Sequence, residues 1–199
     1  MKINNNLIKI YIFIDSFNSL IEKKIQKINN IGIIYENRDI PSENFFKILK
    51  FCKKNKIKLY ILDHFKNVLK YKLNGLVISS YNKTISNTQS IRLKKNNIEI
   101  LGKVHNQLEF CQKIRQGCEI IFLSPIFFTK KHGRNKIFGI SRFNLISLKW
   151  NLRIIALGGI NLSNYKKITM TKSIGIGVKS IIEKLGEKKT RLHLSKRVF

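Results

Sequence analysis

Eight short apolar runs alternate along the chain with longer segments that carry apolar residues at helical spacing. The runs are rich in Ile and Val and cover residues 10–14, 31–35, 57–62, 75–78, 98–102, 119–123, 152–157 and 173–178. Their apolar character is continuous rather than alternating, which is typical of strands buried on both faces of a parallel sheet. We therefore expect each run to form a strand of one parallel sheet.

The segments between the runs predict helices. Ser42, Asn106 and Asn161 each stand where a side chain could cap the first turn of a helix. Asn106 is followed three residues later by Glu109, the spacing of a capping box. Leu108 then begins an apolar stripe at helical spacing, which we expect to face the core.

The alternation of strand and helix predicts one compact α/β domain, a closed (β/α)8 TIM barrel. Segments 84–95 and 141–149 complete the alternation, although their helical periodicity is poor. An open doubly wound sheet is the alternative, because periodicity does not reveal closure. We place the barrel in residues 1–186 and a basic C-terminal tail in 187–199, and interpret the irregular stretch 125–139 as a mobile active-site loop.

The chain is strongly basic, with 39 Lys and Arg against 11 Asp and Glu, a formal net charge of +28. Such a balance attracts nucleic acid, membrane surfaces or phosphorylated metabolites. The lysines are scattered and accompany many Asn and Ile residues, so a codon-driven composition explains much of the charge. We expect small phosphorylated substrates as partners, rather than a membrane or nucleic acid; the oligomeric state stays open.

Three cysteines, Cys52, Cys111 and Cys118, contain no CxxC pair and have no metal-binding spacing. This pattern indicates reduced thiols in an intracellular protein. The apolar run near the N-terminus is too short to span a bilayer, and no small-residue cleavage site comes after it. We therefore expect a cytoplasmic protein.

The aspartates of the chain are Asp15, Asp39 and Asp63, and each lies at or just past the end of one of the first three apolar runs. The reactive face of a parallel barrel is built from the residues just beyond the carboxyl ends of its strands. Aspartate is also common where a loop starts or a helix is capped, which could explain Asp15 and Asp39. For Asp63, which directly precedes His64, we favour a functional role.

Glycines mark the ends of the last two runs. Gly158 and Gly159 come after the seventh run, and the eighth contains Gly-Ile-Gly at 175–177, with Lys179 and Ser180 next. Glycine lets the backbone approach an anion closely, and a helix N-terminus directs N–H groups at it. Barrels often hold phosphate in the loops after strands seven and eight. We expect a phosphate site here, with ordinary tight turns as the alternative.

A second cationic group comes after the sixth run. Thr129, Lys130, Lys131 and His132 place a hydroxyl, two ammonium groups and an imidazole in four successive positions. Together they could clamp a second phosphate or a diphosphate, although an ordinary basic surface loop has the same composition. His105, just past the fifth run, could face the same pocket.

The chain resembles the thiamine phosphate synthase family and its thiazole tautomerase relatives over most of its length, from residue 11 to 182. The matching segments are IYIFID (10–15), Gly102 with His105-Asn106, GCEIIFLSPIFFTK (117–130), ALGGIN (156–161) and IGIGVKSII (174–182). The resemblance implies that a thiazole nitrogen attacks the methylene of a pyrimidine diphosphate and releases pyrophosphate with the help of Mg²⁺. Positioning and charge stabilisation would then carry catalysis.

The resemblance also implies roles for particular residues. The thiazole phosphate would be held by Gly159, Lys179 and Ser180, next to Gly158 and Thr129. The diphosphate would be neutralised by the catalytic group Arg38, Lys130 and Lys131, with further substrate contacts from Lys103, His105 and His132. Asp63, with Asn82 as a second ligand, would bind Mg²⁺, a cation that prefers oxygen ligands.

Several positions depart from the family pattern. Its strand-two signature Q.R.K appears here as Ile34, Glu36 and Arg38, and its serine after strand five is either missing or replaced by Lys103. Its second metal-binding aspartate falls near Asn82. These departures lie mainly on the diphosphate and metal side, whereas the thiazole-phosphate side is better kept.

Our leading hypothesis is a thiamine phosphate synthase-like transferase. The nearest alternative is a relative that binds thiazole phosphate, either tautomerase-like or an inactive paralogue. A nucleic-acid-binding accessory protein that uses the tail 187–199 ranks third, because the sequence contains no recognised nucleic-acid-binding motif.

Overall fold

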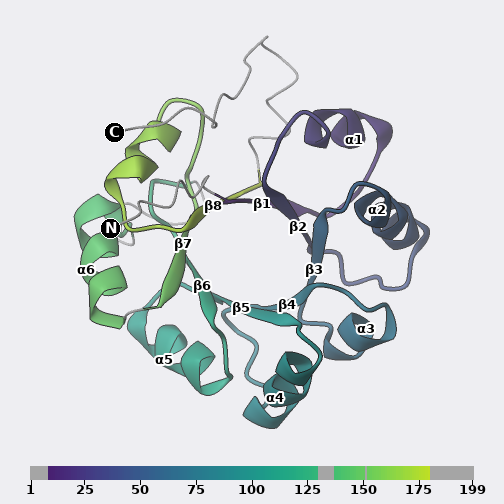
Figure 1. Cartoon of the computed structure of the whole chain (residues 1–199). Helices are drawn as coiled ribbons and strands as arrows, with labels where there is room; N and C mark the ends of the chain where they lie inside the picture. Colours follow the sequence, from purple (N-terminus) through teal and green to yellow (C-terminus); the bar gives the residue numbers. More distant parts are fainter. Residues whose placement is uncertain (1–8, 130–136, 151, 180–199) are drawn as a thin grey trace, which may run out of the picture.

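A closed barrel of eight parallel strands forms the centre of the protein (Figure 1). The computed structural model describes residues 9–129, 137–150 and 152–179. The strands are β1 Lys9–Ile14, β2 Ile31–Tyr35, β3 Lys58–Leu62, β4 Gly75–Ile78, β5 Glu99–Val104, β6 Ile120–Leu123, β7 Arg153–Leu157 and β8 Gly175–Val178. Each strand pairs with the next along the chain, and β8 pairs with β1. This closure confirms the barrel and excludes the open sheet.

Helices surround the barrel in Figure 1. They are α1 Ser19–Ile25, α2 Glu43–Lys54, α3 Phe65–Lys70, α4 Asn87–Lys95, α5 Gln107–Arg115 and α6 Gly139–Trp150. Two of the predicted caps are present: Ser42 accepts from the backbone N–H of Phe45 at 3.3 Å, and Asn106 from that of Glu109 at 2.9 Å. The caps satisfy N–H groups that have no partner within the helix.

The segment after β7 differs from the prediction, because a 3₁₀ helix, η2 Tyr165–Met170, stands where we expect an α-helix that starts at Asn161. The Asn161 side chain accepts from the backbone N–H groups of Ser163, at 2.9 Å, and Asn164, at 3.2 Å. Asparagine often folds the backbone into such a local turn instead of a helix. The side chain therefore forms a turn here, and the helical segment begins later.

The face that α5 buries also differs from the prediction. Leu108 is 84% exposed, whereas the buried residues of this helix are Phe110 and Lys113. Gly102 of β5 makes room for this arrangement, because an added Cβ there would lie 2.9 Å from Cβ of Lys113. The predicted stripe is therefore wrong at Leu108, whereas Ile114, further along it, is partly buried against the core.

The glycines of β8 lie within the strand that the eighth apolar run predicts, so the phosphate site expected at these glycines has no turn at 175–177. A Cβ added to Gly175 would lie 2.6 Å from the backbone oxygen of Lys9 on β1. One added to Gly177 would lie 2.8 Å from Cδ1 of Leu157 and 3.0 Å from the Phe13 ring. Glycine in a strand often marks such a close approach, so these two residues serve the packing of the barrel.

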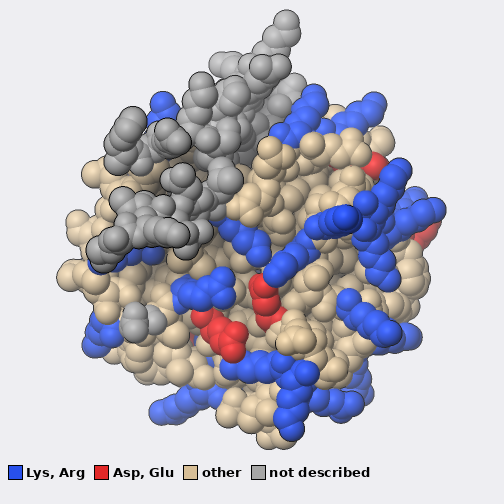
Figure 2. Space-filling model, viewed as in Figure 1, with Lys and Arg blue, Asp and Glu red and all other residues tan. Residues whose placement is uncertain are grey.

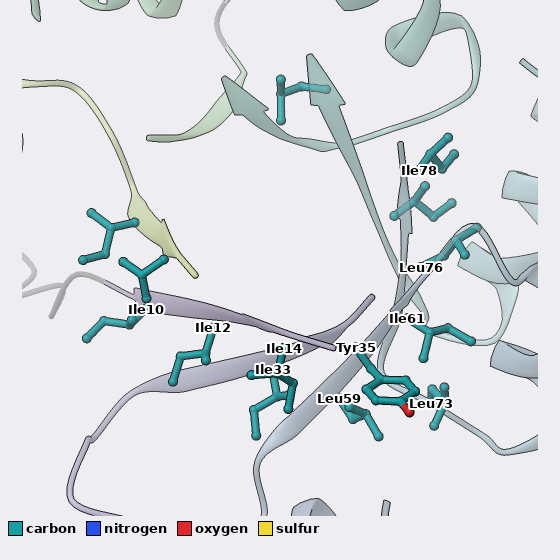
Figure 3. Close-up of a cluster of buried hydrophobic side chains, with 14 of the residues drawn as sticks. Ile10, Ile12, Ile14, Ile33, Tyr35, Leu59, Ile61, Leu73, Leu76 and Ile78 are labelled. Carbon is teal, nitrogen blue, oxygen red and sulfur yellow. The ribbon is translucent and has the colours of Figure 1, made fainter. Parts of the chain in front are cut away.

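Two hydrophobic layers enclose the strands. The outer layer joins strand residues to buried residues of the helices; Figure 3 labels the part that comprises Ile10, Ile12, Ile14, Ile33, Tyr35, Leu59, Ile61, Leu73, Leu76 and Ile78. The inner layer contains strand residues alone, namely Tyr11, Phe13, Ile34, Tyr60, Val77, Leu101, Ile120, Phe122 and Ile155. Side chains therefore fill the barrel, and a binding site must lie at one of its ends.

Positive charge is spread around the face that Figures 1 and 2 show. Lys and Arg side chains lie along much of its perimeter, and acidic side chains lie near its middle as well as at its edge (Figure 2). Within the described ranges, no helix combines the length and apolar character that crossing a bilayer requires.

We predict that alanine substitutions at two leucines close in sequence differ strongly in their effect on the free energy of unfolding. Leu101 is fully buried inside the barrel and Leu108 is 84% exposed. We expect Leu101→Ala to lower the free energy of unfolding by about 2–5 kcal/mol, because it leaves a cavity. The matched change Leu108→Ala should alter it by no more than about 0.5 kcal/mol. Urea denaturation followed by circular dichroism measures both, and equal effects would contradict the assigned layers.

Candidate active site at the carboxyl ends of the strands

Charged side chains from distant parts of the chain meet at the carboxyl ends of the strands. Asp15 comes directly after β1, Glu36 after β2 and Asp63 after β3, while Lys103 lies near the end of β5 and Lys179 comes after β8. The strand-end rule predicts the positions of Asp15 and Asp63. In the sequence, Glu36 stands out only as a departure from the family pattern.

Glu36 bridges two lysines. Its Oε1 lies 2.9 Å from Nζ of Lys103, and its Oε2 lies 2.8 Å from Nζ of Lys179. Lys179 also pairs with Asp15, at 2.8 Å from Oδ2. Lys103 lies over the ring of Phe13, with 4.9 Å between Nζ and the ring centroid. The result is a continuous ionic chain across the mouth of the barrel.

The ionised forms of the side chains in this series of ion pairs stabilise one another. Burial raises the pKa of Glu36, but the ammonium groups of Lys103 and Lys179 outweigh it and hold this pKa below its usual value. Burial lowers the pKa of Lys179, and hydrogen bonds and charge from Asp15 and Glu36 reverse this, so the pKa ends above its ordinary value. Glu36 and Lys179 are therefore ionised at neutral pH.

Asp63 and Asn82, the two predicted metal ligands, lie together. Asp63 Oδ1 accepts from the backbone N–H of Ser79 at 2.9 Å and from Nδ2 of Asn82 at 2.8 Å. The side-chain oxygen of Asn82 accepts from the backbone N–H of Thr84 at 2.9 Å and from its hydroxyl at 3.0 Å. Asp63 itself has a left-handed backbone, with φ of 60°.

This arrangement does not fit a magnesium site that uses both residues. Asn82 directs its amide nitrogen at Asp63, and its oxygen, the atom that a hard cation would take, is engaged with Thr84. Across the described ranges, no group of three His, Cys, Asp or Glu side chains is placed to hold a metal ion. The pair instead joins the turn after β3 to the turn after β4.

A buried lysine stabilises the turn at Asn82 through a hydrogen bond to its backbone. Lys113 of α5 donates from Nζ to the backbone oxygen of Asn82 at 2.7 Å and to Oε1 of Gln116 at 2.8 Å. Gln116 donates in turn to the backbone oxygen of Ile85 at 2.9 Å. Burial lowers the pKa of Lys113. No sequence signal marks this residue, because a lysine in a basic helix has the pattern of a surface residue.

The predicted thiazole-phosphate side forms a close-packed turn. Gly158 and Gly159 have φ of 88° and 73°, a region that glycine adopts without strain. The backbone oxygen of Gly158 accepts from the N–H of Phe127 at 3.1 Å, and a Cβ on Gly159 would collide with backbone atoms of Phe127 and Phe128. The Thr129 hydroxyl, at the end of this segment, is buried and has no hydrogen-bond partner among the described residues.

Other predicted residues lie near the mouth but have protein partners. Arg38 donates from Nη2 to the hydroxyl of Tyr81 at 3.1 Å. His105 lies just before α5, where its backbone N–H and its ring Nδ1 lie 2.7 and 3.1 Å from Oε2 of Glu109. The remaining predicted site residues, Lys130, Lys131, His132 and Ser180, lie outside the described residues, as does the tail 187–199.

Comparison with curated proteins finds relatives of one kind. A thiamine-phosphate synthase of Prochlorococcus marinus is 42% identical over 79 residues, which are 39% of this chain and 22% of that protein. One from Pelagibacter ubique is 29% identical over 138 residues, 68% of this chain and 65% of that protein. The putative thiamine-phosphate synthase 2 of Aquifex aeolicus is 24% identical over 86% of this chain and 90% of that protein. The first two matches thus span less than two thirds of those relatives' lengths.

Solved structures show the same fold. A thiamine phosphate pyrophosphorylase from Pyrococcus furiosus superposes with a TM-score of 0.71 at 17% identity, over 88% of this chain and 87% of that one. The corresponding protein from Bacteroides thetaiotaomicron gives a TM-score of 0.58 at 14% identity, over 94% and 91%. The family model described as thiamine monophosphate synthase matches residues 33–182, about three quarters of the sequence. The chain belongs to the thiamine monophosphate synthase family.

Proposed function

We propose that the protein is a thiamine phosphate synthase-like transferase in the cytoplasm. It joins hydroxymethylpyrimidine diphosphate to thiazole phosphate and releases pyrophosphate. The observation that carries this proposal is the family match over 33–182, which includes the carboxyl ends of β2 to β8. Both substrates are phosphorylated, and the mouth of the barrel presents cations and a glycine turn to them.

The reaction needs little proton transfer. The thiazole nitrogen forms a bond to the methylene carbon of the pyrimidine, and the bond from that carbon to the diphosphate oxygen breaks with its electron pair. Negative charge therefore develops on the leaving diphosphate, and fixed positive groups stabilise it. We assign this role to Lys103 and also to Lys179, which the resemblance places on the thiazole-phosphate side but which Glu36 joins to Lys103. Arg38, Lys130, Lys131 and His132 remain predicted contributors.

The thiazole phosphate is assigned to the turn at Gly158 and Gly159. The left-handed glycines allow the backbone to come close to an anion. The Thr129 hydroxyl is a buried donor without a protein acceptor among the described residues, and a phosphate oxygen would satisfy it. Ser180 is the predicted further contact on this side.

A second candidate function is a relative that binds thiazole phosphate without synthase turnover. Glu36 favours it, because this carboxylate neutralises the two lysines that the diphosphate would need. Stabilisation of the protein by thiazole phosphate, without product formation, would distinguish this relative from the synthase.

The proposed transferase activity is tested by incubating the protein with both precursors and Mg²⁺. We expect thiamine phosphate and pyrophosphate in equal amounts. Lys103→Gln should lower kcat/KM by about 100–1000-fold, the scale of losing one group that stabilises transition-state charge. The exposed Lys50 of α2 offers the matched change, and Lys50→Gln should leave kcat/KM unaltered. Absence of thiamine phosphate at every enzyme concentration would refute the proposal.

A separate experiment tests the thiazole-phosphate side. Thr129→Val keeps the shape of the side chain and removes its hydroxyl. We expect the KM for thiazole phosphate to rise by about tenfold, the value of one hydrogen bond to a charged group, while the KM for the pyrimidine diphosphate stays the same. Thr88→Val, on the exposed face of α4, is the control. An equal rise in both KM values would mean that Thr129 supports the whole mouth rather than this substrate.

A further inference from the structure

Glu36 is placed where a carboxylate is least expected in a site for anions. The chain has 11 acidic residues against 39 Lys and Arg, yet Glu36 and Asp15 lie among the lysines of the mouth. The four groups Asp15, Glu36, Lys103 and Lys179 sum to zero formal charge. A substrate phosphate therefore meets a mouth in which these cations are already paired.

The Glu36 carboxylate imitates a phosphate in its contacts. Two oxygens on one central atom each accept from a different ammonium group, at 2.9 and 2.8 Å. The lysines come from β5 and from the end of β8, so they converge on Glu36 from separate elements. Lysine binds a phosphate as a point charge in the same manner. The space between the two ammonium groups is thus an anion position.

The ion pairs of Glu36 stabilise the two lysines before a substrate binds. The Glu36 and Lys103 side chains are only 12% and 21% exposed, and an ammonium group removed from water needs a partner. The carboxylate supplies that partner at both lysines and fixes where their long side chains point. At neutral pH it stays charged, because the two ammonium groups keep the pKa of Glu36 low.

We propose that Glu36 is a built-in competitor for a phosphate or diphosphate anion at Lys103 and Lys179. In the empty mouth it holds both ammonium groups in place, and it gives them up to the phosphate oxygens when the anion binds. The carboxylate reclaims them as the anion leaves, which lowers affinity for pyrophosphate and favours its release. The identity of the natural anion rests on the proposed function, whereas the competition itself does not.

The test is a calorimetric titration of the full chain with inorganic pyrophosphate, without any organic substrate. We expect Glu36→Gln to lower the Kd for pyrophosphate by at least about tenfold, since the competing charge is gone; tenfold corresponds to about 1.4 kcal/mol. Glu43→Gln is the matched control. It makes the same change in net charge at an exposed residue of α2 that pairs with Lys47 at 2.6 Å, and should alter the Kd less than about twofold.

A double variant shows whether the higher affinity for pyrophosphate depends on the ammonium group of Lys103. In Glu36→Gln combined with Lys103→Gln, the Kd should return to within about threefold of the unaltered protein, because the released ammonium group is absent. Glu36→Asp retains the charge on a shorter side chain that cannot reach both lysines, and should give a smaller gain of about threefold. It also provides a folded variant for the titration if the amide destabilises the barrel.

Pyrophosphate binding that is unchanged or weaker in the Glu36 variants would overturn the proposal, since Glu36 would then only position the lysines. Absence of pyrophosphate binding in every variant would overturn it as well. The titration requires no turnover, so a negative synthase assay leaves a positive result standing. Conversely, an active synthase with an unaltered titration would refute the competition and not the proposed function.

Discussion

The site depends on closure of the barrel between β8 and β1. Four paired positions, from Lys9 with Gly175 to Ile12 with Val178, make this seam, and Gly175 is required because any Cβ would collide with the Lys9 backbone. Closure brings Lys179 to Glu36 across 143 positions of sequence. An open sheet built from the same strands would separate them. The ionic chain at the mouth is therefore a consequence of topology, which local sequence does not encode.

In this strongly basic barrel, acidic side chains lie where several lysine side chains converge. At the amino ends of the strands, Glu99 accepts from the Tyr60 hydroxyl at 2.8 Å and pairs with Lys58 at 2.5 Å. At the carboxyl ends, Glu36 serves two lysines in the same way. Self-repulsion of a high net charge opposes compactness, and it is strongest where side chains lose solvent. At both ends of the barrel, acidic side chains thus pair with the lysines that converge there.

How far the sequence predicts this structure depends on the information that each pattern encodes. Strands buried on both faces must be apolar throughout, so all eight runs are recognisable and the end of the third locates Asp63. Asn82, its hydrogen-bond partner, is indicated only by the family resemblance. A glycine in the sequence indicates a phosphate-binding loop and a tight contact between strands equally well. The phosphate site expected at 175–177 therefore proved to be a place where strands pack closely. Lys113 is hidden because its burial depends on a carbonyl of another element, the backbone oxygen of Asn82. Glu36 is visible as an anomaly, but its meaning requires a partner 67 positions away.

That partner changes how the departures from the family pattern are understood. Taken singly, Glu36 in place of a strand-two arginine and Lys103 in place of a serine are two losses at the diphosphate side. In the folded chain the charged atoms of the two side chains are 2.9 Å apart, so the two departures form one ion pair. Without Glu36, the largely buried ammonium group of Lys103 would lose its acidic partner, which is costly, whereas Glu36 without Lys103 would still pair with Lys179. Lys103 at this position therefore depends on Glu36, and in the competition proposed above this carboxylate is also the group that a phosphate anion displaces.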